Sequence, residues 1–154
     1  MSATRGIQFL ERSKIAYEVK RYDHLEKGAK FASQALGFPV EATIKTLVVT
    51  ISPGGPAYIL MPGDKEIPLK KLAKLLGARR AEMADTGEAE RITGYLVGGI
   101  SPFGAKRRLP TYLEESLLSF ERVAINAGQR GIMVVVSPRD IVNSLGATAI
   151  SLCE

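Results

Sequence analysis

Lys45 stands at the start of a mostly β-branched, apolar stretch that covers residues 45–51. A lysine in such a run is uncommon unless its ammonium is paired or takes part in binding or catalysis. A lysine at a sheet edge, with its ammonium in water, produces the same pattern. The residue types alone leave both interpretations of Lys45 open.

Two further segments are dense in glycine: residues 94–104, GYLVGGISPFG, and residues 126–131, NAGQRG. Glycine permits unusual backbone angles and lets a ligand approach main-chain N–H groups. Such N–H groups can stabilise the oxyanion that forms at an ester carbonyl. Composition alone favours ordinary turns over such a site, so the two segments need support from other features.

Several common sites are excluded. The chain has one histidine, His24, and one cysteine, Cys153, so it lacks a His/Cys set for zinc. The phosphate-binding GxxxxGK[ST] pattern and the Gly-x-Ser-x-Gly elbow are missing. A Ser-His-Asp triad would have to use His24, and no residue near it supports one. Cys153, next to the C-terminus, is interpreted as a bystander thiol. We expect no metal and no cofactor.

The formal net charge is +5, and the basic residues concentrate in residues 65–80 and 106–108. Such an excess favours polyanionic partners, although a solvated helix face gives the same pattern. No apolar run approaches the roughly 18 residues of a membrane span, and the N-terminus lacks the apolar stretch of a signal peptide. We therefore expect a soluble, cytoplasmic protein without a membrane partner.

The spacing of apolar residues predicts the helices. Ile7 and Leu10 lie on one face of a helix over residues 4–13, and a second helix over residues 29–36 ends at Gly37. A third covers residues 69–76, with its lysines outward. Capping signals predict two more: a capping box at Asp85 and Glu88 for a helix that ends near Gly94, and Ser137, Pro138 and Asp140 for the last one.

The strand signals predict a mixed sheet. Ile15, Tyr17 and Val19 alternate with polar residues, as in a half-buried strand. Residues 45–51 and 57–61 flank a Pro/Gly turn and form a hairpin. Residues 123–126 and 132–136 are two more strands, and residues 147–152 close the sheet. The prediction is an α+β fold of one domain, residues 1–154, in which helices surround a mixed, partly closed sheet.

A series of segments, in order along the chain, resembles the YbaK family of synthetase-associated aminoacyl-tRNA editing domains. These segments are residues 44–48 (IKTLV), 75–78 (LLGA), 82–85 (EMAD, a helix start), 93–104 (TGYLVGGISPFG), 106–110 (KRRLP), 128–131 (GQRG) and 137–140 (SPRD). The resemblance runs from about residue 7 to residue 145. It implies a pocket for the 3′-terminal adenosine of a tRNA and the amino acid esterified to it.

The resemblance also assigns site residues. The essential lysine of the family corresponds to Lys45, and the family's Gly-x-x-x-Pro substrate loop corresponds to residues 98–102. Gly98 and Gly99 would then hold the oxyanion through their N–H groups, and Pro102 would fix the shape of the loop. Besides the catalytic Lys45 and Gly98, the substrate-binding residues implied are Tyr22, Thr46, Gly99, Ile100, Ser101, Pro102, Asn126 and Gly128. For the tRNA backbone we expect Lys70, Lys71, Lys74 and Arg107.

The form GGISPFG resembles the Cys-tRNA(Pro) and Cys-tRNA(Cys) deacylases of this family. There the substrate thiol is thought to attack the ester and release the amino acid as a thiolactone, which suits a chain without a convincing nucleophile. Two positions depart from this subgroup: Asn126 replaces a frequent serine, and Met133 replaces a frequent aspartate. The resemblance implies trans-editing of Cys-tRNA(Pro).

Two alternatives remain: a deacylase for another small residue, such as Ala-tRNA(Pro), and a non-catalytic module that binds tRNA or a synthetase. The partners expected are aminoacyl-tRNA and prolyl-tRNA synthetase, with no DNA.

Overall fold

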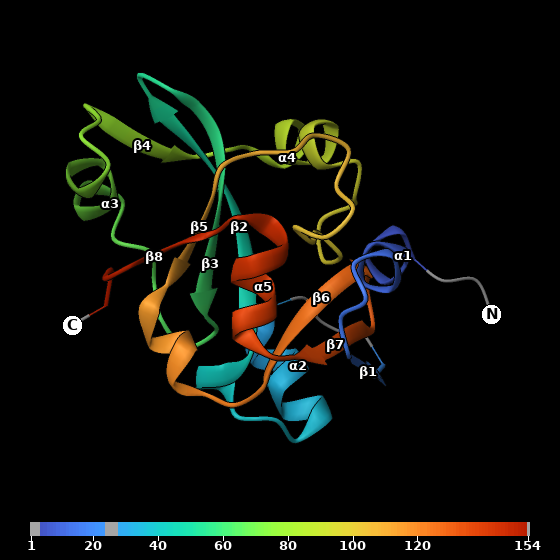
Figure 1. Ribbon diagram of the computed structural model, residues 1–154. Helices are drawn as coiled ribbons and strands as arrows, with labels where there is room; N and C mark the ends of the chain where they lie inside the picture. Colours follow the sequence, from blue (N-terminus) through green and yellow to red (C-terminus); the bar gives the residue numbers. More distant parts are fainter. Residues whose placement is uncertain (1–3, 24–27, 154) are drawn as a thin grey trace.

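The computed structural model describes residues 4–23 and 28–153. Helices are interspersed among the strands, and the pairs β2–β3 and β6–β7 follow each other with no helix between them (Figure 1). The helices are α1 (Arg5–Arg12), α2 (Ala29–Leu36), α3 (Leu69–Leu75), α4 (Thr86–Thr93) and α5 (Pro138–Leu145), with the short 3-10 helices η1 (Val40–Ala42) and η2 (Glu115–Ser119). The strands are β1 (Glu18–Arg21), β2 (Ile44–Ser52), β3 (Gly55–Pro62), β4 (Arg80–Met83), β5 (Thr111–Glu114), β6 (Val123–Gln129), β7 (Ile132–Val136) and β8 (Thr148–Ile150).

The strands divide between two sheets. One is antiparallel, in the order β1-β7-β6, and the other is mixed, in the order β4-β2-β3-β5-β8, with β5 parallel to both β3 and β8. A parallel bridge between Thr43 and Ala124 connects the two. The predicted mixed α+β fold is confirmed, and the sheet that the sequence suggested is realised as two joined parts.

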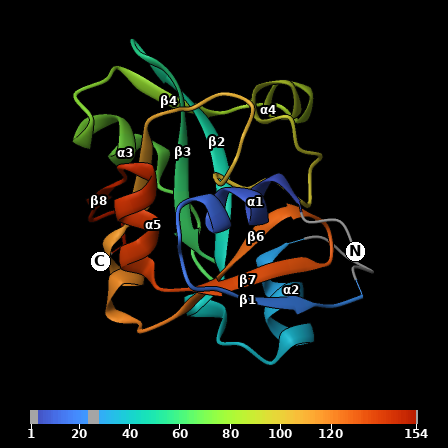
Figure 2. The same cartoon turned by 45° about the vertical axis from the view of Figure 1, so that its right-hand side comes forward.

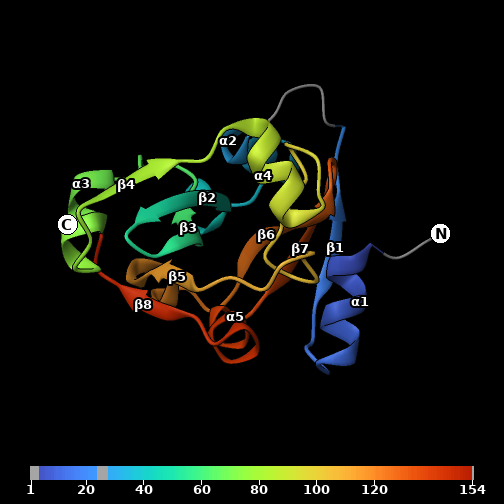
Figure 3. The same cartoon turned by 90° about the horizontal axis from the view of Figure 1, so that it is seen from above.

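The three-stranded sheet is covered on both faces. Ile125 and Val134 pack with Leu10 of α1, whereas Met133 and Val135 pack with Ala32 of α2. Figure 3 shows α1 and α2 on opposite sides of this sheet. The double covering explains why every residue of β7 is buried and why its sequence is an unbroken apolar run.

The β2–β3 hairpin is the centre of the larger sheet. Leu72 of α3 packs with Val49 and Ile59, and Ile92 of α4 packs with Val48 and Tyr58. Alternation along the strands therefore places α3 and α4 against opposite faces. Figure 2 shows the hairpin running between these two helices. In the described part of the chain, no helix combines the length and the apolar character that a bilayer span needs.

Local signals placed several element ends correctly. The Thr4 hydroxyl caps α1 by accepting the N–H of Ile7 at 3.0 Å, and the Asp85 carboxylate caps α4 by accepting the N–H of Glu88 at 2.8 Å. Gly37 and Gly94 end α2 and α4 in the left-handed conformation, with φ of 67° and 78°. The predicted hairpin is also present, with β2 paired antiparallel to β3.

Other boundaries differ from the prediction. The first strand begins at Glu18 rather than near Ile15, and the Ser137 side chain makes no capping hydrogen bond to α5. Residues 82–85, expected at a helix start, are divided: Glu82 and Met83 belong to β4, and only Asp85 caps the helix. Strands β4 and β5 were not predicted, because each has four residues and is fixed by pairing with a distant strand.

Candidate functional site

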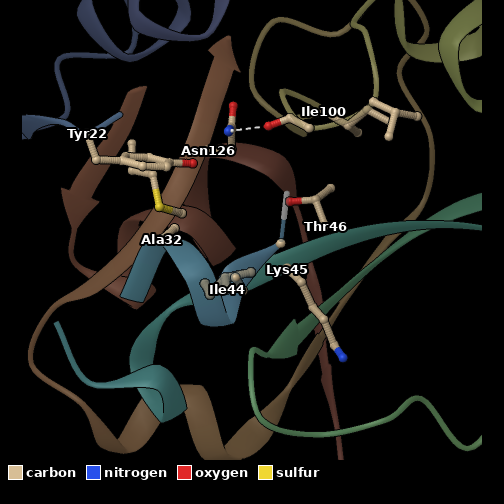
Figure 4. A pocket seen from close by; sticks show the side chains of 12 residues that line it. Tyr22, Ala32, Ile44, Lys45, Thr46, Ile100 and Asn126 are labelled. Carbon is tan, nitrogen blue, oxygen red and sulfur yellow. Dashed lines mark hydrogen bonds between the residues drawn. The ribbon is translucent and has the colours of Figure 1, made fainter. Parts of the chain in front are cut away.

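A pocket of about 250 Å³ lies where the two sheets meet. Its walls come from the segment after β1, from α2, from the start of β2, from the glycine-rich loop after α4, and from β6 and β7. Figure 4 shows these side chains from close by. The lining residues are Tyr22, Gly28, Ala29, Ala32, Ile44, Lys45, Thr46, Val97, Gly98, Ile100, Asn126 and Met133. The sequence-predicted residues that the structure brings together here are Tyr22, Lys45, Thr46, Gly98, Ile100 and Asn126.

The first residues of β2 contribute two different polar groups. Successive residues of a strand face opposite sides, so Thr46 shares a side with Ile44, and Lys45 takes the other. The Thr46 hydroxyl is buried and has no hydrogen-bond partner within the described part of the chain. Leaving such a group unsatisfied costs about 1–3 kcal/mol, so it is suited to bind a polar ligand atom. Lys45 is half-buried, and its ammonium is directed away from Asn126 (Figure 4).

Asn126 connects the two glycine-rich segments. Its Oδ1 accepts the N–H of Gly128 at 2.8 Å and that of Gln129 at 3.2 Å, within an irregularity of the β6–β7 ladder. Its Nδ2 donates to the Gly98 carbonyl at 3.0 Å, the dashed line in Figure 4. These bonds use both ends of the amide to fix the backbone around it.

Gly98 must be glycine for two physical reasons. Its φ is +96°, which residues with a Cβ rarely adopt. A Cβ there would also collide with the side chain of Arg130. The Arg130 Nε lies across this position and donates to the Val97 carbonyl at 2.9 Å. The glycine thus lets an arginine close over the loop.

Gly99 differs from its neighbour. It is buried outside the pocket and lines a separate cavity with Tyr95 and Gly128. Its N–H donates to the Leu96 carbonyl at 2.9 Å. The expectation that Gly99 supplies an oxyanion donor is therefore not met in this structure, because its N–H is already used. Gly128 also lies outside the pocket and packs against Tyr95.

Ser101 and Pro102 also lie away from the pocket. Ser101 is fully buried, and its hydroxyl accepts the N–H of Phe103 at 3.1 Å. Pro102 lines a different cavity, together with Tyr58 and Arg107. The Gly-x-x-x-Pro segment therefore passes from one cavity to another, and Gly98 and Ile100 are its two residues that line the pocket.

The side of the pocket formed by Tyr22 and Met133 is largely apolar. Tyr22 follows β1 directly, as predicted, and its ring lies 6.3 Å from that of Phe31. Burial raises the pKa of Tyr22, so its phenol stays neutral at physiological pH. Met133 is 3% exposed and packs with Ala32. A thioether in this position offers no charge to bind an ammonium group.

The predicted tRNA-binding side chains lie elsewhere. Lys70 and Lys74 are exposed on α3, and Lys71 is half-buried there. Figures 1 and 3 show α3 at the far end of the larger sheet from α2, whose residues line the pocket. Arg107 is exposed and lines a second cavity, together with Arg12 and Arg108. The structure therefore places these basic groups outside the pocket lining, on α3 and on the segment before β5.

The sequence did not identify Arg130, Val97, the first two small residues around the start of α2 (Gly28 and Ala29) or Ala32 as parts of the site. Arg130 lies in a turn between two strands, where an exposed arginine is unremarkable. Its bond to Val97 joins residues 33 positions apart, so no local pattern reveals it. The α2 residues are small and apolar, and nothing distinguishes them from ordinary packing residues.

Cys153 lies outside the pocket lining. Burial and the nearby Glu114 carboxylate raise the pKa of its thiol, which keeps it protonated and weakly nucleophilic. Within residues 4–23 and 28–153, no three His, Cys, Asp or Glu side chains gather closely enough to hold a metal ion. His24 lies outside the described residues.

Comparison with known proteins gives consistent results. Residues 26–143 match the aminoacyl-tRNA editing domain family. The chain is 34% identical over 144 residues to EbsC of Enterococcus faecalis, a proposed Cys-tRNA(Pro)/Cys-tRNA(Cys) deacylase, covering 91% of this chain and 87% of that one. It is 25% identical over 140 residues to the multifunctional Ser/Thr-tRNA deacylase ProXp-y of Escherichia coli K12, covering 88% and 83%.

A crystal structure of a proposed trans-editing enzyme for prolyl-tRNA synthetase is also similar. It superposes with a TM-score of 0.87 and 28% identity, over 97% of this chain and 95% of that one.

Proposed function

The chain belongs to the aminoacyl-tRNA editing domain family and is an aminoacyl-tRNA deacylase, and we propose that its substrate is Cys-tRNA(Pro). The observation that carries the proposal is the composition of the pocket. It offers a glycine backbone, a lysine and a buried threonine hydroxyl, but the residues that line it within the described part of the chain include no cysteine, serine or histidine that could act as a nucleophile or its base. A substrate that brings its own nucleophile fits such a pocket.

Cysteine meets this requirement. Its thiolate is intrinsically nucleophilic and a few per cent populated near neutral pH. The sulfur attacks the ester carbonyl carbon, a C–S bond forms, and the C–O bond to the ribose breaks. The thiol proton ends on the ribose oxygen, and the amino acid leaves as a cyclic thiolactone that water then opens. Holding the thiol against the carbonyl supplies the gain of an intramolecular reaction, about 7–11 kcal/mol in favourable cases.

The backbone and side-chain groups that line the pocket suit distinct roles in this reaction. The Gly98 N–H is the donor for the developing oxyanion, and the unpartnered Thr46 hydroxyl binds the substrate near the start of β2. The Lys45 ammonium, directed away from Asn126, is suited to a phosphate of the 3′-terminal nucleotides. Tyr22, Ile100 and Met133 enclose the amino-acid side chain. Asn126 fixes the loops rather than binding substrate, because both ends of its amide are already bonded.

Outside the pocket, we propose that the tRNA backbone contacts Lys70, Lys71 and Lys74 on α3 and Arg107 before β5, and that these contacts do not read its sequence. Prolyl-tRNA synthetase is proposed as the partner from which the misacylated tRNA comes. The similarity to a trans-editing enzyme for that synthetase supports this partner.

A deacylase for another small residue is the second candidate. The apolar Met133 in the pocket and the similarity to a Ser/Thr-tRNA deacylase favour it. A panel of Cys-, Ser-, Thr- and Ala-tRNA, each charged on tRNA(Pro), separates the two. We expect Cys-tRNA(Pro) to be cleared far faster than Ser-tRNA(Pro), although the side chains are nearly isosteric. Mass spectrometry should detect the thiolactone, or its trapped adduct, before free cysteine. Equal rates on the cysteinyl and seryl esters would refute the thiol mechanism.

A further inference from the structure

The two peptide groups that flank Gly98 are held in different ways. In the peptide between Gly98 and Gly99, the carbonyl accepts from Asn126 at 3.0 Å and the N–H donates to Leu96 at 2.9 Å. Both ends of that peptide are used. In the peptide between Val97 and Gly98, the carbonyl accepts from the Arg130 Nε at 2.9 Å. The Gly98 N–H, at the other end, donates to no acceptor in the part of the chain that the structure describes.

The anchored carbonyl determines where the free N–H points. In a trans peptide the C=O and N–H are directed to opposite sides. Because the Val97 carbonyl faces Arg130, the Gly98 N–H faces away from it. Arg130 lines the cavity shared with Glu90 and Leu96, whereas Val97 and Gly98 line the pocket. The geometry thus turns the Gly98 N–H away from the arginine. The Gly98 N–H, half-buried at the pocket wall and without a protein acceptor in the described chain, is therefore available to a ligand atom in the pocket.

The guanidinium also affects the strength of that donor. The charged Arg130 guanidinium donates to the Val97 carbonyl oxygen and draws electron density away from the N–H of the same peptide. Because hydrogen bonds in such chains strengthen one another, the Gly98 N–H becomes a stronger donor. The side chain comes this close only because position 98 lacks a Cβ. Arg130 therefore acts on the N–H through the peptide and needs no contact with the substrate.

Asn126 fixes the other side of the same glycine. Its Oδ1 accepts two N–H groups, from Gly128 and Gln129, so its amide has one favourable orientation, with the Nδ2 toward the Gly98 carbonyl. The same turn carries Arg130. A single irregular turn thus holds both carbonyls around Gly98, and neither peptide can rotate without losing a bond.

We propose that Arg130 and Asn126 are positioning residues that fix and polarise the Gly98 peptide, so that its N–H serves as the oxyanion donor. This inference rests on the proposed deacylase function and extends it to two residues that act through the backbone.

Arg130→Ala tests the proposal, with Arg139→Ala as the control that removes an equal charge from an exposed position on α5. Single-turnover deacylation of Cys-tRNA(Pro) should slow by about tenfold or more in Arg130→Ala, because small displacements of a reacting group can cost up to about 10²-fold. KM and the melting temperature should stay within experimental error of wild type. The Gly98 amide proton should shift upfield in an NMR spectrum of glycine-labelled protein. Arg139→Ala should change none of these quantities.

Asn126→Asp gives an isosteric second test. The carboxylate still accepts from Gly128 and Gln129 but cannot donate to Gly98, and it places a negative charge beside that carbonyl. We expect a slower chemical step with an unchanged fold. Wild-type rates in both variants, or a Gly98 amide resonance that does not move in Arg130→Ala, would overturn the inference. If wild-type protein cleaves no aminoacyl-tRNA, the proposed function fails instead, and the amide resonance alone decides whether Arg130 polarises the peptide.

Discussion

Asn126 and Glu114 each accept hydrogen bonds from several backbone N–H groups, but they lie in different parts of the molecule. Asn126, half-buried beside the pocket, accepts two N–H groups and donates to Gly98. Glu114, fully buried at the end of β5, accepts from Ser116 at 2.8 Å, from Leu152 at 2.9 Å and from Cys153 at 3.0 Å. The neutral amide has a donor left over for the catalytic loop, whereas the carboxylate only accepts and ties the C-terminal segment to the sheet.

Because of this difference, we expect residues at the pocket to determine activity and Glu114 to determine stability. Substitutions around the pocket should slow the reaction and leave folding intact, because the polar groups there are exposed to a ligand. Substitutions at Glu114 should lower stability and leave the reaction of the folded protein unchanged.

Lys45→Ala should lower kcat/KM on Cys-tRNA(Pro) by about 10²–10³-fold, the range seen when a key electrostatic contact to a reacting substrate is removed. The melting temperature should change little, because Lys45 is only half-buried. Lys45→Met, which keeps the aliphatic stem, should lose as much activity. A Lys45→Met protein within a few-fold of wild type would show that the charge has no part in the reaction.

Glu114→Ala should lower the free energy of unfolding by about 2–4 kcal/mol, because three N–H groups, including that of the buried Leu152, lose a charged acceptor. Urea denaturation measures this loss. Deacylation per folded molecule should match wild type, since Glu114 lies outside the pocket lining. If activity falls more than the folded fraction does, the two regions are coupled and the separation fails.

The same carboxylate predicts a pH dependence. Burial opposes ionisation of Glu114, but the N–H groups of Cys153, Ser116 and Leu152 outweigh it and hold its pKa below the ordinary 4.5. A pKa lowered by folding contributes stability above pH 4.5, and this contribution is lost as the pH falls through the folded value. Melting temperatures of Glu114→Gln should therefore depend less on pH than those of wild type in this acid range.

Charge reversal at Lys70 and Lys74 should weaken tRNA binding several-fold and flatten its salt dependence, because phosphate contacts are lost. Arg107→Glu, in the segment before β5, should do the same. Filter binding at several salt concentrations measures the contribution of each of these two regions. A surface whose reversal leaves affinity and salt slope unchanged does not touch the tRNA.

Cys153→Ser should have the smallest effect. The thiol lies outside the pocket lining, and its pKa is raised, so neither binding nor catalysis should change. Full activity with a melting temperature near that of wild type is expected. Lost activity would mean that a protein thiol takes part in the reaction, contrary to the substrate-assisted mechanism.

The sequence predicted what local chemistry determines. Asp85 as a cap, Gly37 as a helix end and the hairpin after residue 45 each follow from a few adjacent residues. Strand β5 did not, because its parallel pairing with β3 is settled by distant contacts. The same distinction holds in the site. Lys45 and Thr46 were predicted from one short motif, whereas the bond from Arg130 to Val97 exists only in the folded chain.

The substrate-loop motif covers residues that lie in different surroundings. It predicts residues 98–102 as one substrate loop, but the backbone turns within this segment. Ser101 and Pro102 are carried into the interior and toward a second cavity. A linear motif cannot show which of its residues face a ligand, because that depends on dihedral angles such as the φ of Gly98.

The pocket draws its walls from residues as far apart in the chain as Tyr22 and Met133. A chain leaving the ribosome therefore possesses Lys45 and Thr46 long before it can build the site around them, since β7 must first pair with β1. Pairings of such long sequence separation form slowly, after the entropy of closing the intervening loop has been lost. Partly folded chains should accordingly show no deacylase activity. During refolding, deacylation should appear when the smaller sheet is complete.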